Sequence, residues 1–308
     1  MTKTALVLGA GGGAGGETAH ALVRHGWKVR GFARRPREGD GIDWHLGDAM
    51  NRSDVEAAAA GVDVIVHAVN PPGYRNWAAL VLPMIENSIA AAEANGARLA
   101  SPGTIYNYDP RETPVARPDS PQNPSTRKGA IRAELEHRME SANVRSLILR
   151  CGDFFGSYPG NNWLAQGMIK PGKPVMSITT PGRKGIGHAW AYLPDVGEAF
   201  ARLLDIEETL PRFARYHFGG YWDADGIGFA AAVARAAGRP DLKPTELPWM
   251  LLPLAAPFNT TLRELIEMKP FWRHPVRLDN RALIEAIGDE PNTPLDKALA
   301  DTLRALEC

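Results

Sequence analysis

The feature that most constrains this chain is a glycine-rich run that directly follows an apolar segment. Residues 4–8 (Thr-Ala-Leu-Val-Leu) have the composition of a buried strand, and residues 17–25 continue as a helix. A strand that turns tightly into a helix offers unpaired backbone N–H groups and the positive end of the helix dipole to an anion. A plain glycine-rich turn is the alternative. The position after the first strand predicts instead a site for the pyrophosphate of a dinucleotide, formed by Gly9, Gly11, Gly12, Gly13, Ala14 and Gly15.

The end of the next expected strand, residues 28–33, indicates which dinucleotide binds. An Asp or Glu at this point would bind the adenine-ribose hydroxyls of NAD. This chain has Ala33 there, followed by Arg34 and Arg35. Guanidinium groups bind phosphate oxygens in a bidentate way, so the replacement favours the 2′-phosphate of NADP(H). The alternative is a basic pair on a solvated loop.

Composition excludes several classes of protein. The 308 residues contain 35 Lys and Arg against 35 Asp and Glu, so the zero net charge gives no reason to expect a nucleic-acid partner. The most apolar stretch, residues 249–258, is too short to span a membrane. Cys151 and Cys308 form no disulfide framework or metal-binding motif, so we expect a cytoplasmic protein without a metal. The sequence leaves a homodimer open.

Strands and helices alternate through the first half of the chain. Further strands are expected at residues 43–48, 62–69, 97–100 and 144–150, and helices at residues 54–60, 80–95 and 127–143. Ser53 is the expected N-cap of the first of these helices, with Glu56 completing a capping box. The alternation predicts an α/β fold, a doubly wound parallel sheet of the Rossmann type, which binds its ligands at the carboxyl ends of the strands.

Proline and glycine are frequent in the second half of the chain. We therefore expect an NADP-binding Rossmann domain over residues 1–153 and a smaller, mainly helical substrate-binding region over residues 154–308. A segment near residues 186–205 is expected to return to the first domain. The other predicted helices, which we assign to the smaller region, lie at residues 229–237, 261–268 and 280–287.

In the order of its segments the chain resembles the extended and atypical short-chain dehydrogenase/reductase superfamily, which includes NAD(P)-dependent epimerases and dehydratases. Gly9, Gly12 and Gly15 match the superfamily's first-turn glycines, and residues 149–156 are similar to the segment beside the nicotinamide. Asp48 matches the acidic residue that contacts the adenine ring. The resemblance implies additional cofactor contacts from Asp48, Ala49, Ala68, Val69, Gly152 and Phe154.

The superfamily's catalytic motif, Tyr-x-x-x-Lys, is absent. No tyrosine of this chain has a lysine four residues after it. The matching stretch has Thr126 at the tyrosine position and Ala130 at the lysine position, and Pro102 stands where the superfamily has a catalytic serine or threonine. The resemblance therefore implies a cofactor without implying the usual proton-transfer group.

Three residues are candidates for the missing chemistry. The phenol of Tyr106 could reach the ligand crevice from the end of the fifth strand, and Thr104 could donate a hydrogen bond to a substrate carbonyl. Lys128, at the start of the helix that normally carries the motif, could bind a ribose or phosphate. Each has a structural alternative: a packed aromatic ring for Tyr106, a turn cap for Thr104 and a solvated charge for Lys128.

Three further residues have less support as catalytic groups. His67 lies in a buried strand and is expected to be a core histidine, and Cys151 an inert thiol. For His188, lining a substrate pocket and packing in the core both stay open. The sequence as a whole predicts an NADP(H)-dependent oxidoreductase or epimerase/dehydratase-like enzyme acting on a small carbonyl or sugar-like substrate. The alternative is a non-catalytic NADP(H)-binding sensor or regulatory protein.

Overall fold

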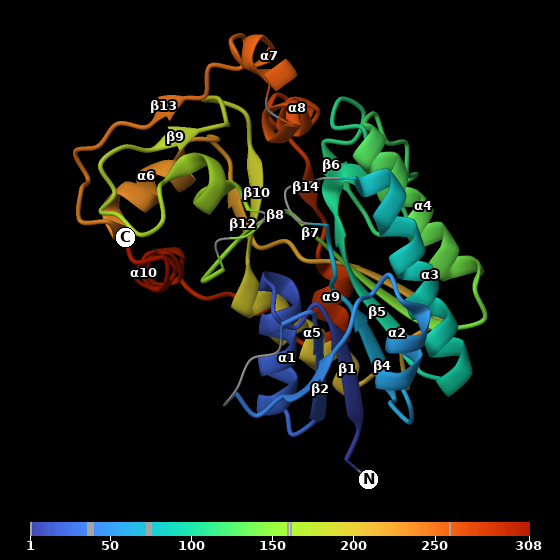
Figure 1. Ribbon diagram of the computed structural model, residues 1–308. Helices are drawn as coiled ribbons and strands as arrows, with labels where there is room; N and C mark the ends of the chain where they lie inside the picture. The colour runs from blue at the N-terminus through green and yellow to red at the C-terminus, as the bar shows by residue number, and fades with distance from the viewer. Residues whose placement is uncertain (1, 36–39, 72–75, 159, 161, 259) are drawn as a thin grey trace.

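A parallel sheet forms the centre of the protein, as the computed structural model shows (Figure 1). The structure describes residues 2–35, 40–71, 76–158, 160, 162–258 and 260–308. Within these residues the sheet has seven strands in the order β11-β7-β5-β4-β1-β2-β3, and every neighbouring pair is parallel. The strands are β1 (Thr4–Leu8), β2 (Lys28–Ala33), β3 (Asp43–Leu46), β4 (Val64–His67), β5 (Arg98–Thr104), β7 (Arg145–Cys151) and β11 (Phe213–His217). The predicted doubly wound fold is confirmed.

Helices cover both faces of this sheet because successive strand residues point to opposite sides. Leu6 and Leu8 pack beneath one group of helices, whereas Ala5 and Val7 pack beneath the other. The first group comprises α2 (Arg52–Ala58), α3 (Trp77–Asn95) and α4 (Arg127–Ser141). The second comprises α1 (Gly13–Arg24), α5 (Leu193–Asp205) and α9 (Arg281–Ile287) (Figure 1).

Three details of the expected organisation differ from the structure. The sequence analysis missed strand β11, which pairs with β7 at the sheet edge and is only partly buried, so it lacks a continuous apolar run. Helix α2 is capped by Asn51, whose side chain accepts a hydrogen bond from the Ser53 backbone N–H, so the expected Ser53 cap is wrong. Asparagine caps as well as serine and stands two residues earlier. Helix α9 belongs to the sheet layer, because it packs against α5 and β11 through Leu283.

The rest of the second half, joined by residues 105–107 and 115–116 of the first half, forms a smaller layer above the carboxyl ends of the strands (Figure 1). Its core is rich in aromatic side chains, among them Trp163, Trp190, Phe229 and Trp272. Its strands are β6 (Val115–Ala116), β8 (Asp153–Phe155), β9 (Thr179–Thr180), β10 (His188–Tyr192), β12 (Tyr221–Asp223), β13 (Thr245–Glu246) and β14 (Arg277–Leu278). Its helices are α6 (Gly228–Ala236), α7 (Leu252–Ala255), α8 (Thr260–Ile266) and α10 (Leu295–Ala305), with short helical turns at η2 (Ile105–Asn107), η3 (Leu164–Met168), η4 (Ala256–Phe258) and η5 (Lys269–Trp272).

Strand β10 leads directly into α5, so the chain passes from the smaller layer back to the sheet within residues 188–205. Helix α5 then packs along α1. This path agrees with the expected return near residues 186–205, while the division of the chain at residue 153 stays a prediction. No helix that the structure describes is both long enough and apolar enough to cross a membrane.

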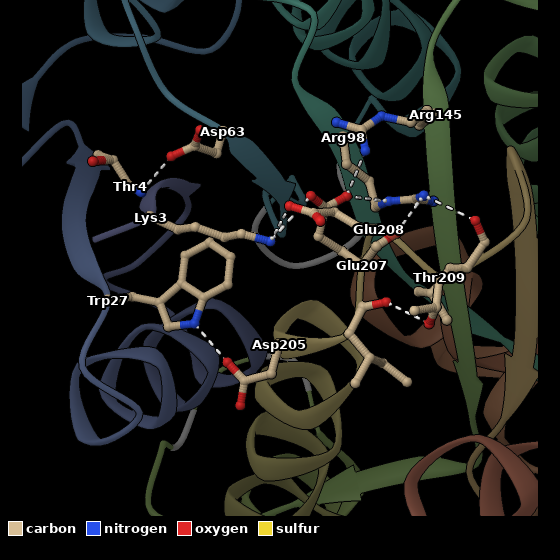
Figure 2. Close-up of polar contacts among 12 residues, drawn as sticks. Lys3, Thr4, Trp27, Asp63, Arg98, Arg145, Asp205, Glu207, Glu208 and Thr209 are labelled. Carbon is tan, nitrogen blue, oxygen red and sulfur yellow. Dashed lines mark hydrogen bonds and ion pairs between the residues drawn. The ribbon is translucent and has the colours of Figure 1, made fainter. Parts of the chain in front are cut away.

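The amino ends of the strands are fixed by a buried ionic cluster (Figure 2). The buried Arg98 guanidinium donates to the Glu207 carboxylate (3.0 Å) and to nearby carbonyl oxygens. Lys3 and Arg145 reach the same carboxylate. A hollow of about 450 Å³ lies beside this cluster and is lined in part by Trp27. The indole N–H of Trp27 already has a partner within the protein, because it donates to Asp205 (2.8 Å). Since doubly wound sheets bind ligands at their carboxyl ends, we take this amino end as structural.

Candidate functional site

The glycine turn after β1 has the geometry that a dinucleotide phosphate site requires. Gly9 has a φ of +86°, and a Cβ on it would lie 2.7 Å from the Ala68 carbonyl oxygen. A Cβ on Gly15 would lie 2.4 Å from the Gly9 carbonyl oxygen. Helix α1 begins immediately after Gly12, and its first turn contains no acidic residue among its described side chains. The turn therefore keeps the backbone open for an anion at the helix N-terminus.

The other residues predicted to contact the cofactor follow neighbouring strands at this edge of the sheet. Asp48 comes two residues after β3 and is exposed, and Ala49 is buried beside it. Ala68 and Val69 follow β4 and approach Gly9, because the Ala68 carbonyl and the Val69 nitrogen lie nearest to that glycine. These positions form one row with the glycine turn, and their contacts with a cofactor stay a prediction.

Arg34 and Arg35 follow β2 at the same edge, and both are exposed. Ala33, the last residue of β2, lies beside the glycine turn, because its Cβ would be 3.9 Å from a Cβ on Gly11. No carboxylate therefore stands at the position where NAD-binding chains place one. Guanidinium groups suit a phosphate chemically, and the binding of a 2′-phosphate by these two cations stays a prediction.

A small cavity lies farther along this edge, at the ends of β5 and β7. Its volume is about 70 Å³, and residues 104–106 and 151–154 form much of its lining. Thr104 is the last residue of β5, and its hydroxyl accepts a hydrogen bond from the Tyr106 backbone N–H (3.2 Å), which caps η2. Thr104 therefore acts as a turn cap, as its structural alternative predicted. Two predicted cofactor residues, Gly152 and Phe154, also line the cavity.

Tyr106 lines this cavity, and its hydroxyl bonds to a residue that the sequence analysis did not select. The hydroxyl donates to Asp153 Oδ1 (3.3 Å), and His188 Nε2 contacts Asp153 Oδ2 (2.8 Å). The Tyr106 ring also packs against Phe271, with ring centroids 5.3 Å apart. The packed-ring alternative for Tyr106 is therefore met, and its catalytic role stays a prediction.

A cation reaches the cavity from α4, and the sequence analysis missed it. Arg132 lines the cavity, donates to Asn70 Oδ1 (3.3 Å) and lies over the Trp77 ring, 4.9 Å from its centroid. The signal that could have revealed it is its spacing, because Arg132 stands one helical turn after the selected Lys128. A guanidinium at this point can bind a ribose hydroxyl or a substrate oxygen.

A buried polar network supports the turn that carries Tyr106. The Asn107 side chain donates to Glu136 Oε1 (2.9 Å). Arg150 binds both oxygens of Glu136, with its Nε 3.0 Å from Oε1. Tyr108 contacts Arg150 and His217 in the same network. Fully paired networks of this kind hold a turn rigidly, so the Tyr106 hydroxyl is well positioned.

Comparison with known proteins identifies the family. The sequence profile of the NAD dependent epimerase/dehydratase family matches residues 5–216, more than half of the chain. The chain belongs to this family. No curated protein sequence matches the chain.

Solved structures with the same fold include enzymes of several activities. The Bordetella bronchiseptica enzyme WbmH, solved with NAD⁺, is 18% identical with a TM-score of 0.74, over 99% of this chain and 98% of that one. UDP-N-acetylglucosamine 4-epimerase from Bacillus cereus is 15% identical with a TM-score of 0.74, over 99% of both chains. L-threonine dehydrogenase from Clostridium difficile is also 15% identical with a TM-score of 0.74, over 99% of this chain and 98% of that one. At these identities the likeness establishes the fold.

One alternative given for Lys128 of this epimerase/dehydratase chain differs from the structure. Lys128 is fully buried, with its Nζ 2.5 Å from Glu264 Oε2 and 2.6 Å from Glu267 Oε2. The solvated-charge alternative is therefore wrong, because the segment that carries α8 covers the start of α4. Lys128 is not among the residues that line the cavity, and its binding of a ribose or phosphate stays a prediction. Thr126, at the tyrosine position, caps α4 by accepting from the Gly129 N–H.

Cys151 lines the cavity but lacks the character of a nucleophile. Its side chain is buried, and burial raises the pKa of its thiol well above the usual value. The thiolate, which is the reactive form, is therefore scarce at neutral pH. The expected inert thiol agrees with this environment.

His67, at the end of β4, makes the stability of the protein depend on pH. Its Nδ1 contacts Ser88 Oγ (2.8 Å), and burial together with the charge of Arg132 lowers its pKa from 6.5 to about 3. Between these values the unfolded chain binds more protons than the folded protein. Stability is therefore full above pH 6.5 and falls as the pH drops, by about 1.4 kcal/mol per pH unit from this group.

Replacing this group should flatten the pH dependence. We expect His67→Gln, whose amide can still bond to Ser88, to lose less stability than the unchanged protein as the pH falls from about 6.5 to about 5. Urea unfolding at several pH values measures both slopes. Equal slopes would show that His67 does not carry this dependence.

Proposed function

We propose that this member of the epimerase/dehydratase family is an NADP(H)-dependent oxidoreductase that acts on a small carbonyl or sugar-like substrate. The observation that supports the proposal best is that Tyr106, whose hydroxyl donates to Asp153, lines a cavity at the same sheet edge as the glycine turn. A bound nicotinamide would exchange a hydride with a substrate carbon. The protein then has to orient the substrate and move one proton.

The proposal gives each group at the cavity a defined role. Tyr106 exchanges the proton with the substrate oxygen, in place of the tyrosine that the family motif would supply. Arg132 binds an oxygen of the cofactor ribose or of the substrate. The glycine turn, with Gly9 and Gly15, holds the pyrophosphate through backbone N–H groups. The small volume of the cavity, about 70 Å³, favours a compact reacting group over a bulky one.

The preference for NADP(H) rests on Ala33, Arg34 and Arg35. We expect the protein to bind NADPH at least about 10-fold more tightly than NADH, because only NADPH carries the phosphate that the guanidinium groups bind. Fluorescence titration with each nucleotide measures this ratio. The double variant R34S/R35S should lose about 10-fold or more in NADPH affinity and keep its NADH affinity.

A matched variant controls for the loss of surface charge. Arg304, an exposed arginine on α10, can be replaced as R304S, and this change should leave both affinities unaltered. Equal binding of NADPH and NADH by the unchanged protein would contradict the NADP(H) assignment. The dinucleotide site itself would still stand if both nucleotides bind.

Turnover decides between an enzyme and the alternative sensor. NADPH oxidation is followed by absorbance with a panel of aldehydes, ketones and nucleotide sugars, and NADP⁺ reduction with the corresponding alcohols. We expect turnover with at least one of them. Nucleotide binding without turnover would favour the alternative, a sensor or regulatory protein, which is motivated by the missing Tyr-x-x-x-Lys. The expected cytoplasmic location belongs to this proposal as well.

A further inference from the structure

Tyr106 lies at the end of a row of side chains that the proposed function does not yet use. Its hydroxyl donates to Asp153 Oδ1 (3.3 Å), and the second oxygen of that carboxylate contacts His188 Nε2 (2.8 Å). The His188 ring stacks on Trp272, with centroids 3.7 Å apart and planes 14° apart. Four separate parts of the chain therefore meet in one row that ends at the cavity.

The backbone fixes this row. Strand β8 starts at Asp153 and pairs in parallel with β10, which starts at His188. Trp272 comes from η5, much later in the chain. The side chain of His188 is only 4% exposed and that of Asp153 11%, so water competes little for their hydrogen bonds. A carboxylate and an imidazole placed so deeply need a partner, and here each is the partner of the other.

We propose that Asp153 is the proton-transfer partner of Tyr106 and that His188 is the positioning residue that orients the Asp153 carboxylate. This proposal rests on the proposed function and extends it to the fate of the proton. It gives the Asp153 carboxylate, on β8, a role in proton transfer in a site that lacks the lysine of the Tyr-x-x-x-Lys motif. The geometry favours it because the Tyr106 hydroxyl directs its hydrogen at Asp153, so the acceptor for this proton is already in place.

The proton step balances in the oxidising direction. The substrate O–H bond breaks and its proton goes to the Tyr106 oxygen, while the Tyr106 O–H bond breaks and that proton goes to Asp153 Oδ1. The substrate carbon loses a hydride to NADP⁺, so an alcohol becomes a carbonyl compound and NADP⁺ becomes NADPH. Asp153 becomes a neutral acid and releases its proton to solvent after turnover. In the reducing direction each transfer runs backwards.

An amide at position 153 separates proton transfer from hydrogen bonding. Asp153→Asn keeps an oxygen that accepts from Tyr106, but it cannot take up the proton. We expect kcat to fall about 100-fold, because general acid–base catalysis contributes about 10²–10⁴-fold, with KM and NADPH affinity unchanged. A merely structural role for Asp153 would leave kcat of this isosteric variant close to that of the unchanged protein.

Two variants of His188 test the positioning role. His188→Gln keeps an N–H donor for Asp153, whereas His188→Phe keeps an aromatic ring to stack on Trp272 but loses the donor. We expect kcat to stay within about threefold for the glutamine variant and to fall about 10-fold or more for the phenylalanine variant. Thermal unfolding of both variants checks that the fold is retained. Equal losses in the two variants would overturn the positioning role.

The outcomes separate this proposal from the proposed function. The measurement uses the full chain with NADPH and the substrate that the panel identifies. If the unchanged protein turns over no substrate, both proposals are overturned. If it turns over and Asp153→Asn is as active as the unchanged protein, the oxidoreductase stands and the proton-transfer role of Asp153 is overturned.

Discussion

Tyr106→Phe should lower kcat by about 10²–10⁴-fold while leaving the protein folded and able to bind NADPH. The change removes one oxygen atom, and the ring that packs against Phe271 is retained. The hydroxyl donates to Asp153, which also lines the cavity, so its loss removes the proposed proton-transfer group and leaves the ring in place. Steady-state kinetics with the substrate that the panel identifies measure the effect on kcat.

A second tyrosine provides the matched control. Tyr216 lies half-buried on the edge strand β11 and is not among the residues that line the cavity. Tyr216→Phe removes the same atom outside the cavity, and we expect kcat to change by less than about twofold. Unaltered kcat in Tyr106→Phe would remove this residue from the mechanism. A loss of NADPH binding in that variant would instead assign the hydroxyl to the cofactor site.

The sheet was predictable from the sequence because its signals are local. The glycine turn, the buried apolar runs of β1 and β4 and the alternation with helices each lie within a short window of sequence. Strand β11 gave no such signal, since an edge strand that is only half-buried needs few apolar residues. The cap of α2 was misplaced by two residues because Asn51 and Ser53 are both good caps.

The candidate cofactor residues could be selected from the sequence for the same reason, whereas the pairing of side chains at the cavity could not. Gly9, Gly15, Ala33 and Arg34 occupy fixed offsets from single strands. Asp153 and His188, however, are 35 residues apart and meet only because β8 pairs with β10. For Lys128 the solvated-charge alternative was wrong, because the burial of this side chain depends on α8, a helix far along the chain. Side chains brought together by tertiary pairing leave no fixed spacing for a sequence motif to record.

Gly15→Ala should abolish dinucleotide binding, with a loss of affinity for NADPH of at least about 100-fold. The new Cβ would lie 2.4 Å from the Gly9 carbonyl oxygen, a backbone atom that cannot rotate away as a side chain can. Relief requires the turn between β1 and α1 to open, which moves the backbone N–H groups that would hold the pyrophosphate. Overpacking of this kind also costs about 1–3 kcal/mol of stability.

The matched control for this change is Gly26→Ala, at the other end of α1. Gly26 has a φ of +82°, and a Cβ there meets nothing within 4 Å. The substitution therefore tests backbone strain without a clash, and we expect it to cost about 1–2 kcal/mol of stability with NADPH affinity unchanged. Nucleotide titration together with urea unfolding measures both quantities. Unaltered NADPH affinity in Gly15→Ala would show that the pyrophosphate does not lie on this turn, because the clash moves the turn whatever else binds nearby.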